Sequence, residues 1–276
     1  MPLSFGLYGL FRDQGVVPET LVRRARLAES AGFESLWVGD HIALPADEGG
    51  DQPRLEVVVG LSYLAAATKR IRLGLGVIVL PQRQPVLLAK QLSSLDVLSN
   101  GRLTVGLGVG YVEGELAALG ATLADRGART DEYLAAMRTL WTEPVASFSG
   151  RYVTFDRVSQ LPLPVQRPHP PLVIGGHSDA ALRRAVATAQ GWYGVYLGVP
   201  ETAELLARLR TLEAARPAGL GPLEITITPP GPVHAQTAKE YAALGVDRLV
   251  LQPTTPDGSD LEEVIRSAER DLIGKL

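Results

Sequence analysis

Residues 71–109 read IRLGLGVIVLPQRQPVLLAKQLSSLDVLSNGRLTVGLGV, two apolar runs separated by a stretch with a helical period. Within that stretch, Leu88, Leu92 and Leu95 fall at positions i, i+4 and i+7, which places them on one face of a helix. A proline near its start and Gly101 just after its end are typical helix boundaries. The segment therefore predicts a strand, a helix and a second strand, the repeating unit of parallel α/β folds.

The same alternation extends over the whole chain. Eight apolar runs, most of them rich in Val, Ile and Leu and bounded by Gly or Pro, have the character of buried parallel strands. They are Leu3–Leu10, Ser35–Gly39, Ile71–Leu80, Leu103–Val109, Leu172–Ile174, Trp192–Leu197, Leu223–Thr228 and Arg248–Leu251. Eight such units in 276 residues have the size and rhythm of a TIM barrel, and no linker divides the chain. We therefore predict an α/β fold in which residues 1–276 form a single (β/α)8 TIM-barrel domain.

Two local patterns add detail to this outline. Residues 145–158 alternate aromatic and polar side chains around a Ser-Gly pair, which predicts a hairpin between the fourth helix and the fifth strand. Ser259 and Glu262 have the spacing of a capping box, which predicts the start of the last helix.

Composition and charge exclude several classes of function. The chain has no cysteine, which excludes disulfides, thiolate metal sites and a cysteine nucleophile. The net charge is −3 and no long basic run occurs, so nucleic acid and anionic membranes are poor partners. No apolar run reaches the ~20 residues of a membrane span, and no basic region precedes the first apolar stretch. We expect a cytoplasmic protein that acts on a small molecule.

Polar residues follow several predicted strands at their C-terminal ends, where barrel enzymes carry catalytic groups. Asp40 and His41 follow the second strand. An imidazole titrates near neutral pH and a neighbouring carboxylate can orient it, so His41 is a candidate general acid and base. The alternative is an aspartate that caps the next turn beside a surface histidine. The chain's histidines (His41, His169, His177 and His234) do not cluster on strand ends, so we predict no metal site.

A glycine-rich turn, Gly-Gly-His-Ser at residues 175–178, follows the fifth strand and opens a helix. Two glycines allow a backbone to approach a ligand closely, and a helix N-terminus presents free N–H groups to an anion. Ser178 occupies the N-cap position, so its hydroxyl serves either the helix or a phosphate. The glycines of residues 106–110 do not complete a dinucleotide fingerprint, because the third glycine would fall at Tyr111.

Several segments, taken in order, resemble the luciferase-like monooxygenase family. They are AESAGFESLWVGDH at residues 28–41, RLGLGV at 72–77, LSNGR at 98–102 and GGHS at 175–178. The resemblance runs nearly from end to end and is strongest to the branch that uses coenzyme F420, a deazaflavin. It implies a bacterial luciferase-like barrel with a tricyclic ring across its C-terminal end and a homodimeric assembly.

The resemblance also assigns roles to individual residues. It implies a cis peptide between Gly76 and Val77, in a bulge of the third strand that supports one face of the ring. It implies that Asp40 touches the ring system and that His41 is the catalytic acid and base. The phosphate end of the cofactor is expected at two loops, which carry Val109, Gly110 and Tyr111, and Gly175, Gly176, His177 and Ser178.

Three functions agree with these observations. The first is an oxidoreductase that transfers a hydride between coenzyme F420 and a small organic substrate. The second is an FMN-dependent monooxygenase that uses O2, and the third is a flavin-binding barrel without catalysis. The chain lacks the long insertion that is typical of the luciferases, which favours the deazaflavin branch. The sequence does not identify the substrate.

Overall fold

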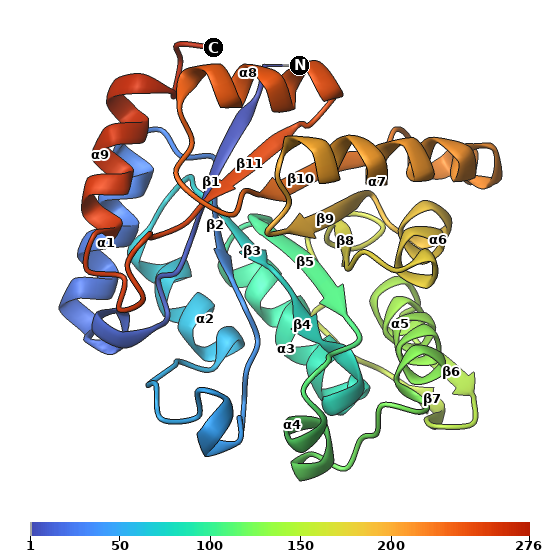
Figure 1. Ribbon diagram of the computed structural model, residues 1–276. Coiled ribbons are helices and arrows are strands. Elements are labelled where there is room, and N and C mark those ends of the chain that lie inside the picture. The colour runs from blue at the N-terminus through green and yellow to red at the C-terminus, as the bar shows by residue number, and fades with distance from the viewer. Residues whose placement is uncertain (1) are drawn as a thin grey trace.

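Parallel strands form a closed barrel in the computed structural model, which describes residues 2–276 (Figure 1). The barrel strands are β1 (Ser4–Tyr8), β2 (Ser35–Val38), β3 (Arg72–Leu75), β4 (Ile78–Val79), β5 (Leu103–Gly108), β8 (Leu172–Gly175), β9 (Gly191–Val195), β10 (Glu224–Thr228) and β11 (Arg248–Leu251). The sheet runs β3-β2-β1-β11-β10-β9-β8-β5-β4, and β3 also pairs with β5, which closes the ring. Because β3 and β4 are two halves of one interrupted strand, the barrel has eight strands, and the predicted TIM barrel is confirmed.

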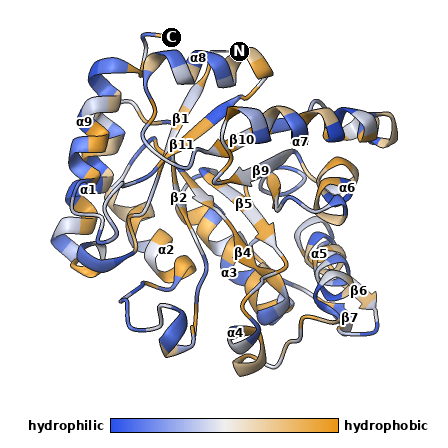
Figure 2. Ribbon diagram, in the orientation of Figure 1, coloured by the Kyte–Doolittle hydropathy of each residue, from blue (hydrophilic) through white to orange (hydrophobic). Residues whose placement is uncertain are grey.

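Helices surround this barrel on the outside (Figure 1). The α-helices are α1 (Pro18–Ser30), α2 (Val57–Ala67), α3 (Pro85–Leu98), α4 (Glu113–Ala118), α5 (Arg126–Thr142), α6 (Asp179–Thr188), α7 (Val199–Leu212), α8 (Ala235–Leu244) and α9 (Leu261–Asp271). Short 3-10 helices lie in the connections: η1 (Asp13–Val16), η2 (Ala46–Glu48), η3 (Leu80–Gln82), η4 (Glu213–Ala215) and η5 (Ala218–Leu220). Hydrophobic and hydrophilic residues alternate along the helices, so that each buries one face and exposes another (Figure 2).

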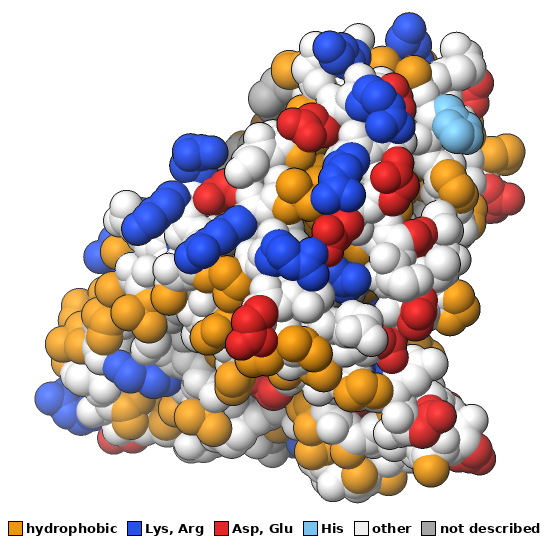
Figure 3. Space-filling view, turned by 90° about the vertical axis from the view of Figure 1, so that its left-hand side faces the viewer, with side chains coloured by type: hydrophobic (Ala, Val, Ile, Leu, Met, Phe, Trp, Pro, Cys, Tyr) orange, Lys and Arg blue, Asp and Glu red, His pale blue; other side chains and the backbone are white. Residues whose placement is uncertain are grey.

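The first and last helices, α1 and α9, pack side by side on the outside of the barrel (Figure 1). Arg23 of α1 forms an ion pair with Glu262 of α9. Figure 3 shows the side of the molecule on which α1 and α9 lie. Basic and acidic side chains are dense in its upper part, and hydrophobic side chains gather lower on it. Within residues 2–276, no helix combines the length and the apolar character that a membrane crossing needs.

The predicted hairpin is confirmed, and the predicted capping box is wrong. Strands β6 (Ala146–Ser149) and β7 (Thr154–Val158) pair in antiparallel fashion. Helix α9 begins after Asp260, whose carboxylate accepts hydrogen bonds from the amide and hydroxyl groups of Thr254 and Thr255. Although burial raises the pKa of Asp260, these four hydrogen bonds lower it to about 2. The aspartate closes the loop before the helix, so the capping function of a Ser-Glu pair is not used.

The interior of the barrel is filled around the buried Trp37. Gly6 and Gly74 lie against this indole, since a Cβ atom would come within 2.8 Å and 2.6 Å of it, respectively. Tyr193 packs on the indole with a centroid separation of 5.4 Å, and the guanidinium of Arg248 lies 5.5 Å from it. Large side chains therefore fill the barrel below the C-terminal ends of its strands.

The third barrel strand is interrupted by a bulge at Gly76–Val77. The peptide bond between these two residues is cis, as the family resemblance implied. The pairing register also changes there: Gly74 faces Thr104, whereas Ile78 faces Leu107. Four steps along one strand therefore match three steps along its neighbour, which is the definition of a β-bulge. The predicted break in regular pairing is confirmed.

Three glycines of neighbouring strands make room for this bulge. A Cβ atom at Gly106 would lie 1.8 Å from the carbonyl oxygen of Leu75. At Gly108 and Gly175 it would lie 2.6 Å and 2.8 Å from methyl groups of Val77. Distances below 3 Å are steric clashes, so these glycines are required by the packing of the barrel. The glycine-rich pattern of the fourth strand thus has a structural cause.

Candidate active site

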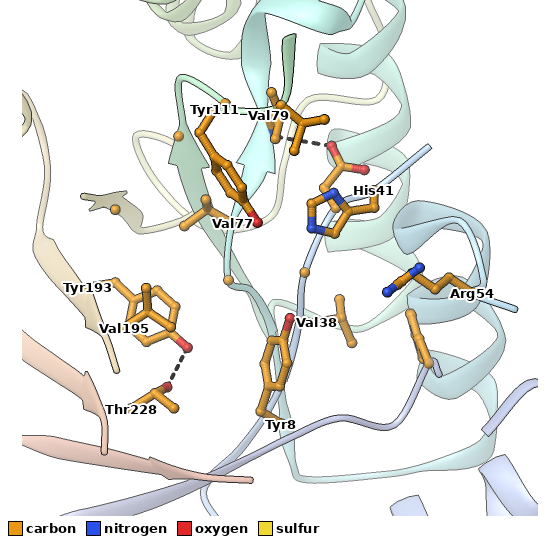
Figure 4. Close-up of a pocket in the computed structure, with 18 of the residues that line it drawn as sticks. Tyr8, Val38, His41, Arg54, Val77, Val79, Tyr111, Tyr193, Val195 and Thr228 are labelled. Carbon is orange, nitrogen blue, oxygen red and sulfur yellow. Dashed lines mark hydrogen bonds between the residues drawn. The ribbon is translucent and has the colours of Figure 1, made fainter. Parts of the chain in front are cut away.

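A cavity of about 680 Å³ opens at the C-terminal ends of the barrel strands (Figure 4). This volume lies within the range of roughly 300–1,000 Å³ that is usual for small-molecule sites. Apolar side chains form much of its wall, and among them are the valines Val38, Val77, Val79, Val109 and Val195. Polar groups converge from several loops onto the same space, so the cavity has the composition expected of a ligand site.

The imidazole of His41 lines this cavity and is held from one side by Glu115. Its Nδ1 atom lies 3.1 Å from Oε2 of Glu115, which belongs to the short helix α4. The other carboxylate oxygen, Oε1, accepts hydrogen bonds from the amides of Ile42 at 2.5 Å and Ala43 at 3.3 Å. The Glu115 side chain is buried, whereas a quarter of the His41 side chain is exposed. Glu115 therefore fixes both the histidine ring and the loop that carries it.

The protonation state of Glu115 determines which nitrogen of His41 faces the cavity. Burial raises the pKa of Glu115, but the hydrogen bonds from His41 and Ile42 outweigh burial and lower it. Glu115 is therefore a carboxylate, which can only accept a hydrogen bond, so Nδ1 of His41 carries the proton. Nε2 has no partner among residues 2–276 and is available to a substrate. This is the arrangement of a general base that is oriented by a carboxylate.

Asp40, the neighbour of His41, has a different role from that carboxylate. Its Oδ2 atom accepts hydrogen bonds from the amide of Val79 at 3.0 Å and from Nε of Arg83 at 3.1 Å. A second nitrogen of Arg83 pairs with Oδ1, and Arg83 also pairs with Glu56 at 2.7 Å. Asp40 borders the cavity, but its oxygens are directed to the backbone that follows the bulge. It anchors Val79, and contact of Asp40 with the cofactor ring stays a prediction.

Burial and pairing have opposite effects on the pKa values of Asp40 and Arg83. Burial raises the pKa of the Asp40 carboxyl, while the hydrogen bonds from Arg83 and Val79 oppose the rise. Burial lowers the pKa of Arg83, but Asp40 and Glu56 outweigh burial and raise it, so Arg83 stays a cation. A buried cation needs an anionic partner. We therefore treat Asp40 as ionised in the folded protein.

Two tyrosines close the floor of the cavity (Figure 4). The hydroxyl of Tyr193 is hydrogen-bonded to Oγ1 of Thr228 at 2.6 Å, and burial raises the pKa of Tyr193. Tyr8 points its hydroxyl into the cavity beside Gly39, where a Cβ atom would lie 2.2 Å from that oxygen. Burial raises the pKa of Tyr8 as well, so both phenols stay neutral hydrogen-bonding groups near pH 7.

The loop after β5 supplies backbone and one ring to the cavity wall. Val109, Gly110 and Tyr111 all line it, as the proposed phosphate loop requires. Gly110 has a φ of 77°, a left-handed conformation that favours glycine. Tyr111 is 76% exposed and lies edge-on to His41 with ring centroids 6.2 Å apart. The position of this loop agrees with the predicted role, but cofactor contact itself stays a prediction.

The predicted phosphate loop after β8 is divided between two roles. Gly175, Gly176 and His177 line the cavity. Ser178 lies outside the lining and caps helix α6 by accepting a hydrogen bond from the amide of Ala181 at 3.3 Å. Of the two alternatives for this hydroxyl, the structure therefore shows the helix cap. Gly176 has a φ of 117°, a conformation that favours glycine, so any side chain there would strain the backbone.

His177 borders the cavity as a neutral ring. Burial lowers its pKa, and its Nε2 atom accepts a hydrogen bond from the amide of Val195 at 3.2 Å. An accepting Nε2 places the proton of the neutral imidazole on Nδ1. His177 therefore offers one hydrogen-bond donor without a positive charge.

Sequence reasoning missed Glu115, Arg12 and Arg54, all of which lie at this site. Glu115 follows the fourth predicted strand, in the sequence Glu-Gly-Glu. Because barrel enzymes carry catalytic groups after the C-terminal ends of their strands, this position could have been identified from the sequence. Arg12 and Arg54 line the cavity from the loops after β1 and β2. Within residues 2–276, no group of three or more His, Asp or Glu side chains is placed to hold a metal ion.

The fold and the site together define a TIM-barrel enzyme with a small-molecule cavity and an oriented histidine. A sequence model of the luciferase-like monooxygenases matches residues 5–271, and the chain belongs to this family. It is therefore an oxidoreductase of a family whose members use a flavin or a deazaflavin.

Relatives of this chain include members with both types of cofactor. The uncharacterized protein Rv0953c of Mycobacterium tuberculosis (strain ATCC 25618 / H37Rv) is 34% identical over 205 residues, which cover 69% of this chain and 71% of the relative. The FMNH2-dependent dimethylsulfone monooxygenase of Pseudomonas putida is 33% identical over 172 residues, 61% of this chain and 46% of the relative. A solved F420-dependent secondary alcohol dehydrogenase has a TM-score of 0.78 at 16% identity, covering 99% of this chain and 98% of that one.

Proposed function

We propose that this protein transfers a hydride between coenzyme F420 and a small organic substrate, with His41 as the acid and base. The observation that carries the proposal is the contact between His41 and the buried Glu115 carboxylate at the edge of the cavity. That contact holds a proton on Nδ1 of His41, so Nε2 is the nitrogen that can exchange a proton with a substrate. A binding barrel without catalysis has no requirement for an imidazole oriented in this way.

The reaction of an alcohol illustrates why such a base is required. Oxidation removes a hydride from carbon, which the bound deazaflavin would accept, and a proton from the hydroxyl oxygen. Nε2 of His41 takes this proton, and the Glu115 carboxylate stabilises the imidazolium that results. In the reverse direction, the same nitrogen returns the proton to the carbonyl oxygen of the substrate.

The residues present fit a flavin or deazaflavin. The valine walls of the cavity suit the faces of an aromatic ring, and Val77 presents its side chain from the bulge (Figure 4). The backbone of Gly110 and of Gly175–His177 borders the same space and would hold the polar end of the cofactor. Hydrogen-bonding groups of Tyr8 and His177 would meet the edges of the ring.

The alternative function is an FMN-dependent monooxygenase that uses O2. It is supported by the relative that is an FMNH2-dependent dimethylsulfone monooxygenase. The matched region covers only 46% of that relative. The solved F420-dependent dehydrogenase, by contrast, shares the fold over 98% of its length.

Side-by-side titration with coenzyme F420 and FMN tests the choice of cofactor. We expect F420 to bind at least about tenfold more tightly, a difference of about 1.4 kcal/mol. Intrinsic fluorescence or calorimetry with the purified protein measures both affinities, and free riboflavin serves as a control for non-specific ring binding. Tighter binding of FMN, with reduced FMN consuming O2 in the presence of the protein, would establish the alternative.

We further propose that the protein forms the homodimer implied by its family resemblance. Apolar side chains are exposed on the neighbouring helices α2 and α3, namely Val59, Tyr63, Leu87 and Leu98, and a second copy would cover them. We expect light scattering to give twice the chain mass of 29.5 kDa. Tyr63→Glu should shift this mass to that of a monomer, whereas Val145→Glu on the hairpin should not. A monomeric wild-type protein would refute the dimer.

A further inference from the structure

Two arginines lie side by side in the backbone at one side of the cavity mouth, and neither forms an ion pair within residues 2–276. Arg12 follows β1, and Arg54 lies in the loop between β2 and α2. Their backbones form an isolated antiparallel bridge, which is fixed by hydrogen bonds from Leu55 to Phe11 and from Asp13 to Pro53, both 3.1 Å. Residues that face each other in such a bridge have Cβ atoms about 5 Å apart, and like charges there are unfavourable. An anion bound between the arginines would remove this repulsion.

Neither guanidinium has an ion-pair partner among residues 2–276, although Glu48 lines the same cavity. Arg54 donates to the carbonyl oxygen of Gly49 at 2.6 Å and to Oε1 of Gln52 at 2.8 Å, which are neutral acceptors. Arg12 lies 5.8 Å from the ring centroid of Tyr8 and has no hydrogen bond or ion pair from its side chain among residues 2–276. Both arginines line the cavity, and Arg54 points into it on the side of His41 (Figure 4). Their unused donors are therefore available to a ligand.

The position of Arg12 in the barrel separates it from the glycine-rich loop after β8, one of the two loops assigned to the phosphate end of the cofactor. Around the ring, β8 is four strands from β1 in either direction. Arg12 therefore lies across the cavity mouth from Gly175–His177. A cofactor whose polar end lies on the β8 side leaves the β1 side of the cavity to the substrate.

We propose that Arg12 and Arg54 bind a carboxylate group of the substrate, and thus that the enzyme acts on an organic acid. A carboxylate accepts two parallel hydrogen bonds from a guanidinium, and its single negative charge offsets the repulsion between the two arginines. The carboxylate would be held on the side of the cavity where Nε2 of His41 is available. The carbon that reacts near His41 can therefore belong to the same small molecule as the carboxylate. This inference rests on the proposed hydride transfer, although the subsite itself can be measured without turnover.

Calorimetry with matched neutral and anionic probes tests the subsite. The probes are hexanoate against hexanamide and benzoate against benzamide, titrated into the protein alone and into protein saturated with F420 or FMN. We expect each carboxylate to bind at least about tenfold more tightly than its amide, because hydrogen bonds to charged groups are strong. Arg12→Gln should abolish this preference, and Arg12→Lys should retain part of it. Arg70→Gln, an exposed arginine at the opposite end of the barrel, should leave it unchanged.

Three outcomes would overturn the subsite. Equal affinity for acid and amide in the wild-type protein, or no binding of either, shows that no carboxylate is recognised. A preference that survives in the Arg12→Gln/Arg54→Gln variant shows that other groups are responsible. A loss of F420 or FMN affinity in that variant, with the carboxylate preference intact, shows that the arginines hold the cofactor. Failure of both cofactors to bind would refute the proposed function, while the probe titration on the protein alone would still decide the subsite.

Discussion

Glu115→Gln is expected to lower turnover about 10²–10⁴-fold, the range typical of losing a general base or its correct tautomer. The amide oxygen of the substituted side chain would keep accepting from the backbone N–H groups of Ile42 and Ala43. Its NH2 group would then face Nδ1 of His41, which would have to accept a hydrogen bond. The ring proton would move to Nε2, and this nitrogen could no longer take a proton from substrate.

The pH dependence of turnover distinguishes this role from a merely structural one. The Glu115 carboxylate stabilises the imidazolium, so its removal should move the acid limb of the kcat/KM profile to lower pH. Cofactor affinity should stay within about twofold of wild type. The control is Glu113→Gln, an exposed residue of the same helix, which should behave as wild type.

The His41→Ala variant provides the benchmark for this prediction. It should lose as much turnover as Glu115→Gln, and the double variant should lose little more, because the two residues act as a unit. Additive losses would show that Glu115 acts independently of His41. Wild-type turnover in His41→Ala would end the assignment of this histidine as acid and base.

Arg83→Met is expected to lower the free energy of unfolding by about 3–5 kcal/mol, the usual cost of removing one partner of a buried ion pair. The carboxylate of Asp40 is only 1% exposed and would keep a single hydrogen bond, from the amide of Val79. Glu56 would also lose its partner. Urea denaturation followed by circular dichroism measures the loss.

Two further variants show that the loss comes from an uncompensated buried charge. Asp40→Asn combined with Arg83→Met removes both charges and should recover much of the stability, since an amide oxygen can still accept from Val79. Arg266→Met breaks an exposed ion pair with Glu262 and should cost no more than about 1 kcal/mol. If Arg83→Met cost as little as Arg266→Met, the buried pair would not stabilise the segment after the bulge.

Hydrophobic patterning was sufficient to predict the architecture. Each of the eight apolar runs overlaps a barrel strand, because a strand buried on both faces is apolar along its length and is bounded by Gly or Pro. The hairpin of β6 and β7 was likewise predictable from its alternating aromatic and polar residues. The capping box failed because the helix begins one residue later than the Ser-Glu spacing assumes, with Asp260 and not Ser259 at the N-cap.

The roles of the candidate site residues were less accessible to sequence reasoning. The order of strands places Asp40 and His41 at the cavity, as predicted. Adjacent in sequence, they nevertheless have separate partners, since Asp40 binds Arg83 and His41 binds Glu115. Ser178 matched a phosphate loop in sequence, yet its hydroxyl serves a helix.

The sequence by itself determined the barrel, the end of it that carries the site, and the histidine that faces the cavity. Only the tertiary structure decided that Glu115 orients His41, that glycines of β5 and β8 make room for Val77, and that Arg12 lies beside Arg54. The physical reason is the range of the interactions. The periodicity of apolar residues can be recognised within the sequence of one strand or helix. A hydrogen bond or ion pair at the site joins residues from different segments, which only closure of the barrel brings within about 3 Å of each other.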